Sequence, residues 1–142
     1  MSKISEPNFP HNQGRIGIGS QPSFSGYKKP VFCFQHLHNE HSLSLCAQHS
    51  EKRLIRGLMV RLEDLSRTDW NEIQLRPKEQ GGSEKIPISA LNCNLPNSIS
   101  DDIESLLSIR FANTSGRIIG FRGSDGLFNV VYIDISLSVY RH

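Results

Sequence analysis

The last third of the chain alternates apolar and polar residues, and this alternation constrains the fold more than any other feature. The alternation runs over residues 107–111, 119–122 and 128–133. The intervening residues 113–116 and 123–126 consist of Asn, Thr, Ser, Asp and Gly, which favour tight turns. Because side chains of a strand point alternately to the two faces of a sheet, this pattern predicts a meander of antiparallel strands.

A helical period precedes the meander. Ser50 is a good N-cap, and apolar residues follow at helical spacing from Leu54 to Leu65, so we expect an amphipathic helix over residues 50–66. Gly57 lies inside this helix and indicates close packing. Residues 68–73 fit a second short helix with Trp70 as a core anchor.

The remaining segments complete the expected topology. Residues 31–38 begin with β-branched and aromatic side chains and predict a first strand, and residues 139–140 are expected to close the sheet. We expect residues 39–48 to be irregular and residues 76–90 to be mostly loop. The fold class is therefore α+β, with an antiparallel β-meander packed against one or two helices.

Composition predicts one domain of residues 30–142 after a flexible tail of residues 1–29, which is rich in Gly, Ser, Pro, Asn and Gln. The tail contains no apolar run of signal-peptide or membrane-spanning length. The three cysteines cannot all pair with one another, which fits reduced thiols. We therefore expect a cytoplasmic protein without a membrane partner.

Arginines on the meander are the first candidate for a functional site. Arg110 and Arg122 each lie between core-facing neighbours, Arg117 opens the middle strand, and the chain ends on Tyr140-Arg141-His142. Converging guanidinium groups bind phosphate, Tyr140 can contact a base or a phosphate oxygen, and His142 can transfer a proton near neutral pH. The alternative is an ordinary solvated sheet face, on which arginine is common.

A carboxylate beside these arginines would supply a general base. Glu84 is the preferred residue because it lies in a Gly-flanked segment that leads back to the sheet. The alternative is a solvated surface residue, as most Glu residues are. Residues 106–142 carry a net charge of +2 and residues 31–105 one of −3, and this asymmetry permits nucleic-acid binding at the sheet but does not require it.

A second kind of site is indicated by Cys33, His36, His38 and Cys46, since Cys and His at short spacing are zinc ligands in principle. The alternative is a polar strand end with exposed histidines. No other feature of the sequence indicates a cofactor.

The meander resembles that of the RelE/YoeB-like ribonuclease toxins of bacterial toxin–antitoxin systems. The matching segments are residues 109–111, 116–122, 128–133 and 139–142, and they are also similar to small uncharacterised bacterial proteins that end in Tyr-x-His. The resemblance implies a small endoribonuclease that cleaves mRNA at the ribosome and is neutralised by a protein antitoxin.

The resemblance also assigns roles. Arg110 or Arg117 would hold the phosphate, Arg122 would stabilise the transition state and His142 would be the general acid, with 2′-hydroxyl attack on the adjacent phosphate and no cofactor. A competing hypothesis is a non-enzymatic module that binds or inhibits another protein, of the kind found in phages and mobile elements.

Overall fold

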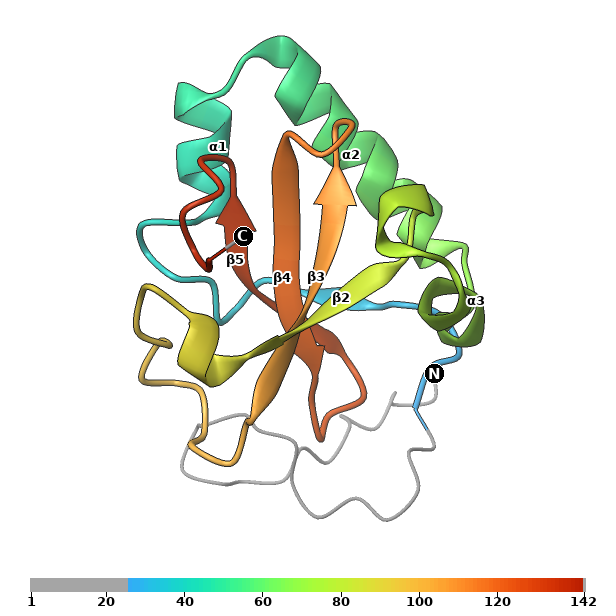
Figure 1. Cartoon of the computed structure of the whole chain (residues 1–142), viewed down its shortest axis with the longest axis vertical. Coiled ribbons are helices and arrows are strands. Elements are labelled where there is room, and N and C mark those ends of the chain that lie inside the picture. Colours follow the sequence, from blue (N-terminus) through green and yellow to red (C-terminus); the bar gives the residue numbers. More distant parts are fainter. Residues whose placement is uncertain (1–25, 142) are drawn as a thin grey trace, which may run out of the picture.

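A computed structural model describes residues 26–141 and shows five strands in one mixed sheet (Figure 1). The strands lie in the order β1-β5-β4-β3-β2, with β2 to β5 antiparallel and β1 parallel to β5. The bounds are β1 Phe32–Cys33, β2 Ser83–Pro87, β3 Ser105–Phe111, β4 Gly116–Arg122 and β5 Phe128–Asp134. The α+β class and the antiparallel meander are confirmed, and one short parallel strand is added.

Three helices accompany the sheet, and α2 lies across one of its faces (Figure 1). The bounds are α1 Leu43–His49, α2 Lys52–Ser66 and α3 Trp70–Leu75, with short 3-10 turns η1 Lys78–Gln80 and η2 Ile88–Ala90. The predicted amphipathic helix is confirmed as α2, although Glu51 rather than Ser50 precedes it and forms no side-chain cap. No helix within residues 26–141 is long and apolar enough to cross a membrane.

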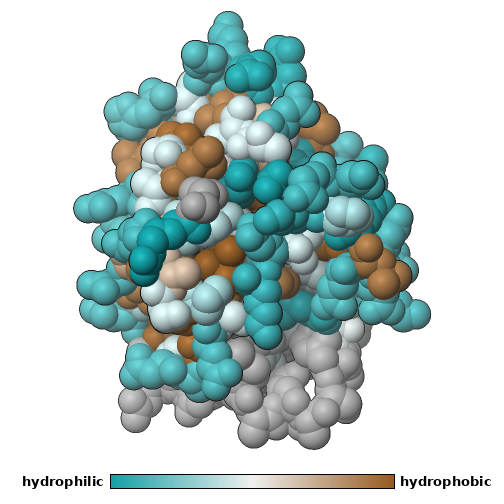
Figure 2. Space-filling model, viewed as in Figure 1, coloured by the Kyte–Doolittle hydropathy of each residue, from teal (hydrophilic) through white to brown (hydrophobic). Residues whose placement is uncertain are grey.

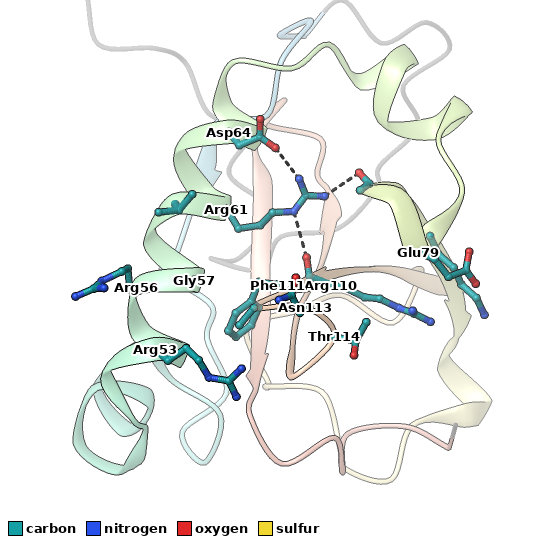
Figure 3. A pocket seen from close by; sticks show the side chains of 14 residues that line it. Arg53, Arg56, Gly57, Arg61, Asp64, Glu79, Arg110, Phe111, Asn113 and Thr114 are labelled. Atoms are coloured by element: carbon teal, nitrogen blue, oxygen red, sulfur yellow. Dashed lines mark hydrogen bonds and ion pairs between the residues drawn. The ribbon is translucent and has the colours of Figure 1, made fainter.

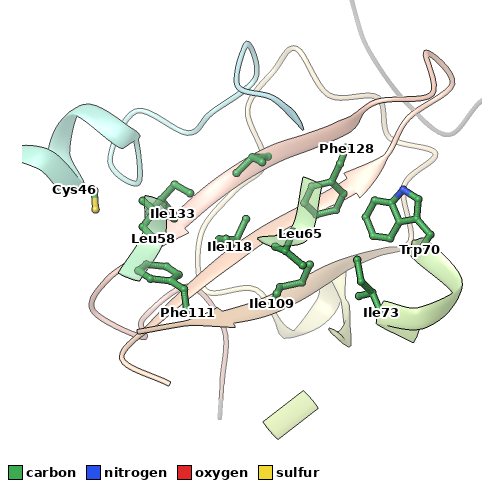
Figure 4. Close-up of a cluster of buried hydrophobic side chains, with 11 residues drawn as sticks. Cys46, Leu58, Leu65, Trp70, Ile73, Ile109, Phe111, Ile118, Phe128 and Ile133 are labelled. Carbon is green, nitrogen blue, oxygen red and sulfur yellow. The ribbon is translucent and has the colours of Figure 1, made fainter. Parts of the chain in front are cut away.

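The main core lies between the helices and the sheet (Figure 4). Leu58 and Leu65 of α2 and Trp70 and Ile73 of α3 point toward apolar side chains of β3, β4 and β5. The strand side chains are Ile109, Phe111, Ile118, Phe128, Val130 and Ile133. Burial of such apolar area is the dominant stabilising contribution, and Trp70 is confirmed as a core anchor.

The opposite face of the sheet is also buried, and within residues 26–141 it is covered by loops and the short η2 turn rather than by an α-helix. Residues 88–103 and 139–140 pack there, and their apolar side chains form a second core with the sheet. This core contains Ile86, Ile99, Ile103, Leu106, Ile119, Phe121, Val131, Tyr132, Val139 and Tyr140. On the outside of these segments, hydrophobic residues appear as separate patches among hydrophilic ones (Figure 2).

Two predicted irregular segments are regular, and both predictions were wrong. Within 39–48 the Ser42 side chain accepts a hydrogen bond from the Leu45 amide at 3.1 Å and starts α1. Within 76–90 the chain forms β2 at the edge of the sheet. Pro87 favoured the prediction of a loop, because proline lacks the amide proton that a central strand needs. β2 is an edge strand, in which a missing amide proton costs little stability.

The two ends of the predicted sheet also differ from expectation. The first strand stops at Cys33 rather than extending to residue 38. Because β1 occupies the outer edge of β5, residues 139–140 cannot close the sheet there. They pair instead with the loop before β3, where Tyr140 bridges Leu91 and the Asn92 amide donates to the Val139 carbonyl at 2.7 Å.

The start of the described chain is attached to α3. The Trp70 amide donates to the Lys28 carbonyl at 2.8 Å, and Lys29 forms an ion pair with Asp69 at 2.8 Å. Residues 1–25 of the predicted tail lie outside the described residues.

Candidate functional site

The strand register separates the three arginines of the meander. Arg110 lies directly opposite Arg117 on the face away from the helices. Arg122 pairs with Phe128 on the helix face, where its guanidinium carbon lies 4.9 Å from the centre of a Trp70 ring. At about 3.3 Å per residue, Arg122 is also about 16 Å along β4 from Arg117. Arg110 and Arg122 therefore lie on opposite faces of the sheet and do not converge on one site.

Arg117 supports the fold and is not accessible to a substrate. Its side chain is buried, and Nη1 donates to the carbonyls of Thr114 and Gly116 at 2.8 and 3.0 Å. These bonds hold the turn between β3 and β4. On the other side, Arg117 is the cross-strand neighbour of the fully buried Asp134.

Glu84 and Tyr140, by contrast, are brought together. The buried hydroxyl of Tyr140 donates to Glu84 Oε2 at 3.4 Å and lies 3.0 Å from Ser108 Oγ. Glu84 is the cross-strand partner of Ser108, and Lys78 Nζ lies 3.3 Å from Glu84 Oε1. The structure thus holds this partly exposed carboxylate between a hydroxyl and an ammonium group.

A basic groove of about 650 Å³ lies between α2, the β3–β4 turn and η1 (Figure 3). Its ionisable side chains are Arg53, Arg56, Arg61, Asp64, Lys78, Glu79 and Arg110. β2 begins opposite Ile109, which leaves Arg110 at the uncovered end of β3. Figure 3 shows Arg110 extending across the groove toward Glu79, Arg53 reaching in from α2 and Arg56 pointing away.

The Arg61 side chain connects the two walls of this groove. Its guanidinium donates to the carbonyls of Arg110 and Gly81 at 3.1 and 2.7 Å, and it pairs with Asp64 at 2.6 Å. Burial lowers the pKa of Arg61 from its ordinary value. Within residues 26–141, Arg53 and Arg110 form no ion pair, so these two remain available for an anion.

A strained turn forms the end of the groove. Ala112, Asn113 and Thr114 all have positive φ angles, of 51°, 52° and 78°. Such conformations cost roughly 1–2 kcal/mol for each residue that is not glycine. α2 contacts this turn at Gly57, where an added Cβ would lie 2.7 Å from Ala112 Cβ, so the predicted close packing is confirmed. Strain of this kind is concentrated at functional sites.

Sequence reasoning missed Arg53 and Lys78. The helical period places Arg53 on the polar side of α2, and nothing in that period shows that the end of a strand faces it. Lys78 follows Pro77 in a segment interpreted as loop. His142 lies outside the described residues, so its position relative to the groove stays a prediction.

The predicted zinc set is not assembled. The His36 ring bonds to Ser98 Oγ at 2.8 Å, and burial lowers the pKa of His36. Cys46 lies in the helix-side core, and His38 instead lies beside His41. Because β1 ends at Cys33, the strand alternation that would align His36 and His38 does not continue to them.

Fold and site together define a small α+β domain with a basic groove beside a hydrogen-bonded carboxylate. Comparison with protein-family models, with curated proteins and with solved structures finds no match to this chain.

Proposed function

We propose that this protein binds single-stranded RNA in the basic groove and cleaves it as an endoribonuclease, the activity of the RelE-like toxins. The observation that carries the proposal is the connection between groove and carboxylate. Lys78 lines the groove and also pairs with Glu84, whose other oxygen accepts the Tyr140 hydroxyl. A phosphate bound beside Arg110 would therefore lie near a fixed carboxylate.

Binding would depend on the phosphate backbone. Arg53 and Arg110 approach the groove from opposite walls (Figure 3). Guanidinium groups form paired, charge-assisted hydrogen bonds with phosphate, and they also stabilise charge that develops on the phosphate oxygens during reaction. Asp64 is already paired with Arg61, so the excess charge of the groove is positive.

The reaction would be transesterification within the RNA. Glu84 removes the proton of a 2′-hydroxyl, the 2′-oxygen attacks the adjacent phosphorus, and the bond to the 5′-oxygen breaks. The leaving 5′-oxygen receives a proton, which we assign to His142. The products are a 2′,3′-cyclic phosphate and a 5′-hydroxyl. Tyr140 is a positioning residue for Glu84, and Arg122 belongs to the helix face and takes no part.

A cleavage assay tests these roles. A labelled RNA oligonucleotide and its DNA counterpart are incubated with the full chain and separated by length. We expect cleavage of RNA only, because DNA lacks the nucleophile. Glu84→Gln should abolish cleavage and retain binding, whereas Arg110→Ala should weaken both. Arg67→Ala, which alters an exposed arginine at the C-cap of α2 outside the groove lining, is the matched control. Cleavage by Glu84→Gln at the wild-type rate would contradict the role of Glu84.

A second candidate function is favoured by the outer face of α2. Met59 and Val60 are 66% and 63% exposed, and they border a shallow hollow together with Ile55. Although Met59 belongs to the apolar period of residues 54–65, its side chain faces outward. Exposed apolar residues that adjoin one another on a helix commonly contact a protein partner. This face would suit an amphipathic helix of an antitoxin or other regulated protein.

Co-purification from the native host tests this candidate. We expect a partner to be retained by the wild type and lost from Met59→Glu. Leu75→Glu is the matched control, because Leu75 is 85% exposed on α3. A partner that survives Met59→Glu would contradict a docking site on α2.

A further inference from the structure

The loop that follows β1 brings two imidazoles and a carboxylate together, away from the basic groove. One side-chain ligand atom from each of His38, Glu40 and His41 lies within 4.8 Å of the other two. We propose that these three residues bind a divalent transition-metal ion, with Zn²⁺ as the first choice.

The donor set fits this class of ion. Imidazole favours zinc, copper, nickel and iron over magnesium and calcium, and two imidazoles with one carboxylate form an open metal site. Ligand atoms at about 2.1 Å from a tetrahedral ion lie about 3.4 Å apart. The present separations, none above 4.8 Å, therefore have to shorten by at most about 1.4 Å, and Glu40 is exposed enough to move. Water would occupy the remaining coordination position.

The loop backbone already fixes the two histidines. The His38 amide donates to the Val131 carbonyl at 2.7 Å, and the His41 carbonyl accepts from the Ile133 amide at 2.8 Å. The His41 amide also donates to the His38 carbonyl at 3.1 Å. The loop is thus attached to β5 on both sides of the metal-binding segment. This attachment reduces the ordering that metal binding would otherwise require.

The rings themselves are positioned by Tyr132. Its ring centre lies 5.4 Å from that of His38 and 5.7 Å from that of His41, and the two imidazole centres lie 5.3 Å apart. One hydrogen bond opposes binding, because the Glu40 amide donates to His38 Nδ1 at 3.1 Å. A metal bound at His38 would replace this bond or require the ring proton to move, so we expect moderate rather than very tight affinity.

Zinc titration of the metal-stripped full chain tests the proposal. Isothermal titration calorimetry should show one saturable site in the wild type. His41→Ala removes a ligand, and we expect at least the 10–100-fold loss of affinity that follows from changing an outer-shell partner. Glu40→Gln, which alters an exposed side chain, should also weaken binding. His49→Ala removes an exposed histidine outside the group and should bind as the wild type does.

Circular dichroism of each variant separates lost ligands from lost folding. A folded Glu40→Gln protein with weakened zinc binding supports the site even if His41→Ala unfolds. Absence of saturable binding in the wild type would overturn the proposal. Equal affinity in the wild type and in folded His41→Ala and Glu40→Gln proteins would overturn it as well, because the zinc would then be held elsewhere, for example by His11 or His142.

Discussion

Replacing Gly57 with alanine has two opposing effects on stability: it raises the helix propensity of α2, and it places a methyl group too close to Ala112. In an unobstructed helix this change would stabilise the protein by about 1 kcal/mol. Here the new Cβ would lie 2.7 Å from Ala112 Cβ and 3.0 Å from Ala112 Cα. Favourable carbon–carbon contacts require about 3.5–4.0 Å, so α2 or the turn has to move by nearly 1 Å.

The magnitude follows from the rigidity of the turn. Overpacking costs about 1–3 kcal/mol, and a backbone neighbour with positive φ has little freedom to move, which places the cost near the upper limit. After subtraction of the propensity gain, we expect Gly57→Ala to lower the free energy of unfolding by about 2 kcal/mol. Urea denaturation monitored through Trp70 fluorescence measures this value.

A double-mutant cycle identifies the cause. Ala112→Gly removes the contacting methyl group and suits a φ of 51°. In that background Gly57→Ala should be much less destabilising, with a coupling of at least about 1 kcal/mol. If Gly57→Ala stabilised the protein, or if the effects of the two changes were additive, α2 would not be in tight contact with the β3–β4 turn at the end of the groove.

Three further predictions concern buried polar groups. Burial lowers the pKa of His36 below its value in the unfolded chain, so the unfolded state binds more protons and the free energy of unfolding should fall as the pH drops below about 6.5. In urea titrations at several pH values, His36→Gln should reduce this decline. An unchanged pH dependence in the variant would contradict the prediction. Asp134 is fully buried and accepts hydrogen bonds from the amides of Ser138 and Val139. In chemical denaturation, Asp134→Ala should lower the free energy of unfolding by about 3 kcal/mol, and a loss below about 1 kcal/mol would contradict this. Tyr140→Phe removes the hydroxyl that bonds to the buried Ser108 hydroxyl, and it should lower the free energy of unfolding by about 1–3 kcal/mol. Thermal unfolding measures the effect, and an unchanged midpoint would show that the bond contributes nothing to stability.

The strongest periodic signals predicted the fold correctly. The alternation around Ile109 and Ile119 and the helical spacing from Leu54 to Leu65 are long enough to outweigh local ambiguity. α1 and β2 were missed because each is short and is stabilised by tertiary contacts. β2, for example, depends on pairing with β3, and its own sequence between Gly82 and Pro87 suggests a loop.

The candidate site was only partly predictable. Glu84 and Tyr140 are hydrogen-bonded to each other, and Lys78 joins Glu84 to the groove that Arg110 lines. Arg117, however, is buried, and Arg122 lies on the opposite face. The error came from assuming that only one face of the sheet is buried, whereas residues 88–103 and 139–140 bury the second face. Gly57 did indicate close packing of α2, but no local pattern shows that its neighbour is Ala112 in the β3–β4 turn.

The most direct test of the central claim is RNA binding as a function of salt. Fluorescence anisotropy of a labelled single-stranded RNA should give a linear fall of log affinity with log salt concentration. Loss of one phosphate contact should lower the slope by about 0.7–1 in Arg110→Ala and in Arg53→Ala. Arg67→Ala, outside the groove lining, should match the wild type. Absence of RNA binding at low salt, or identical slopes for all four proteins, would contradict an RNA site in this groove.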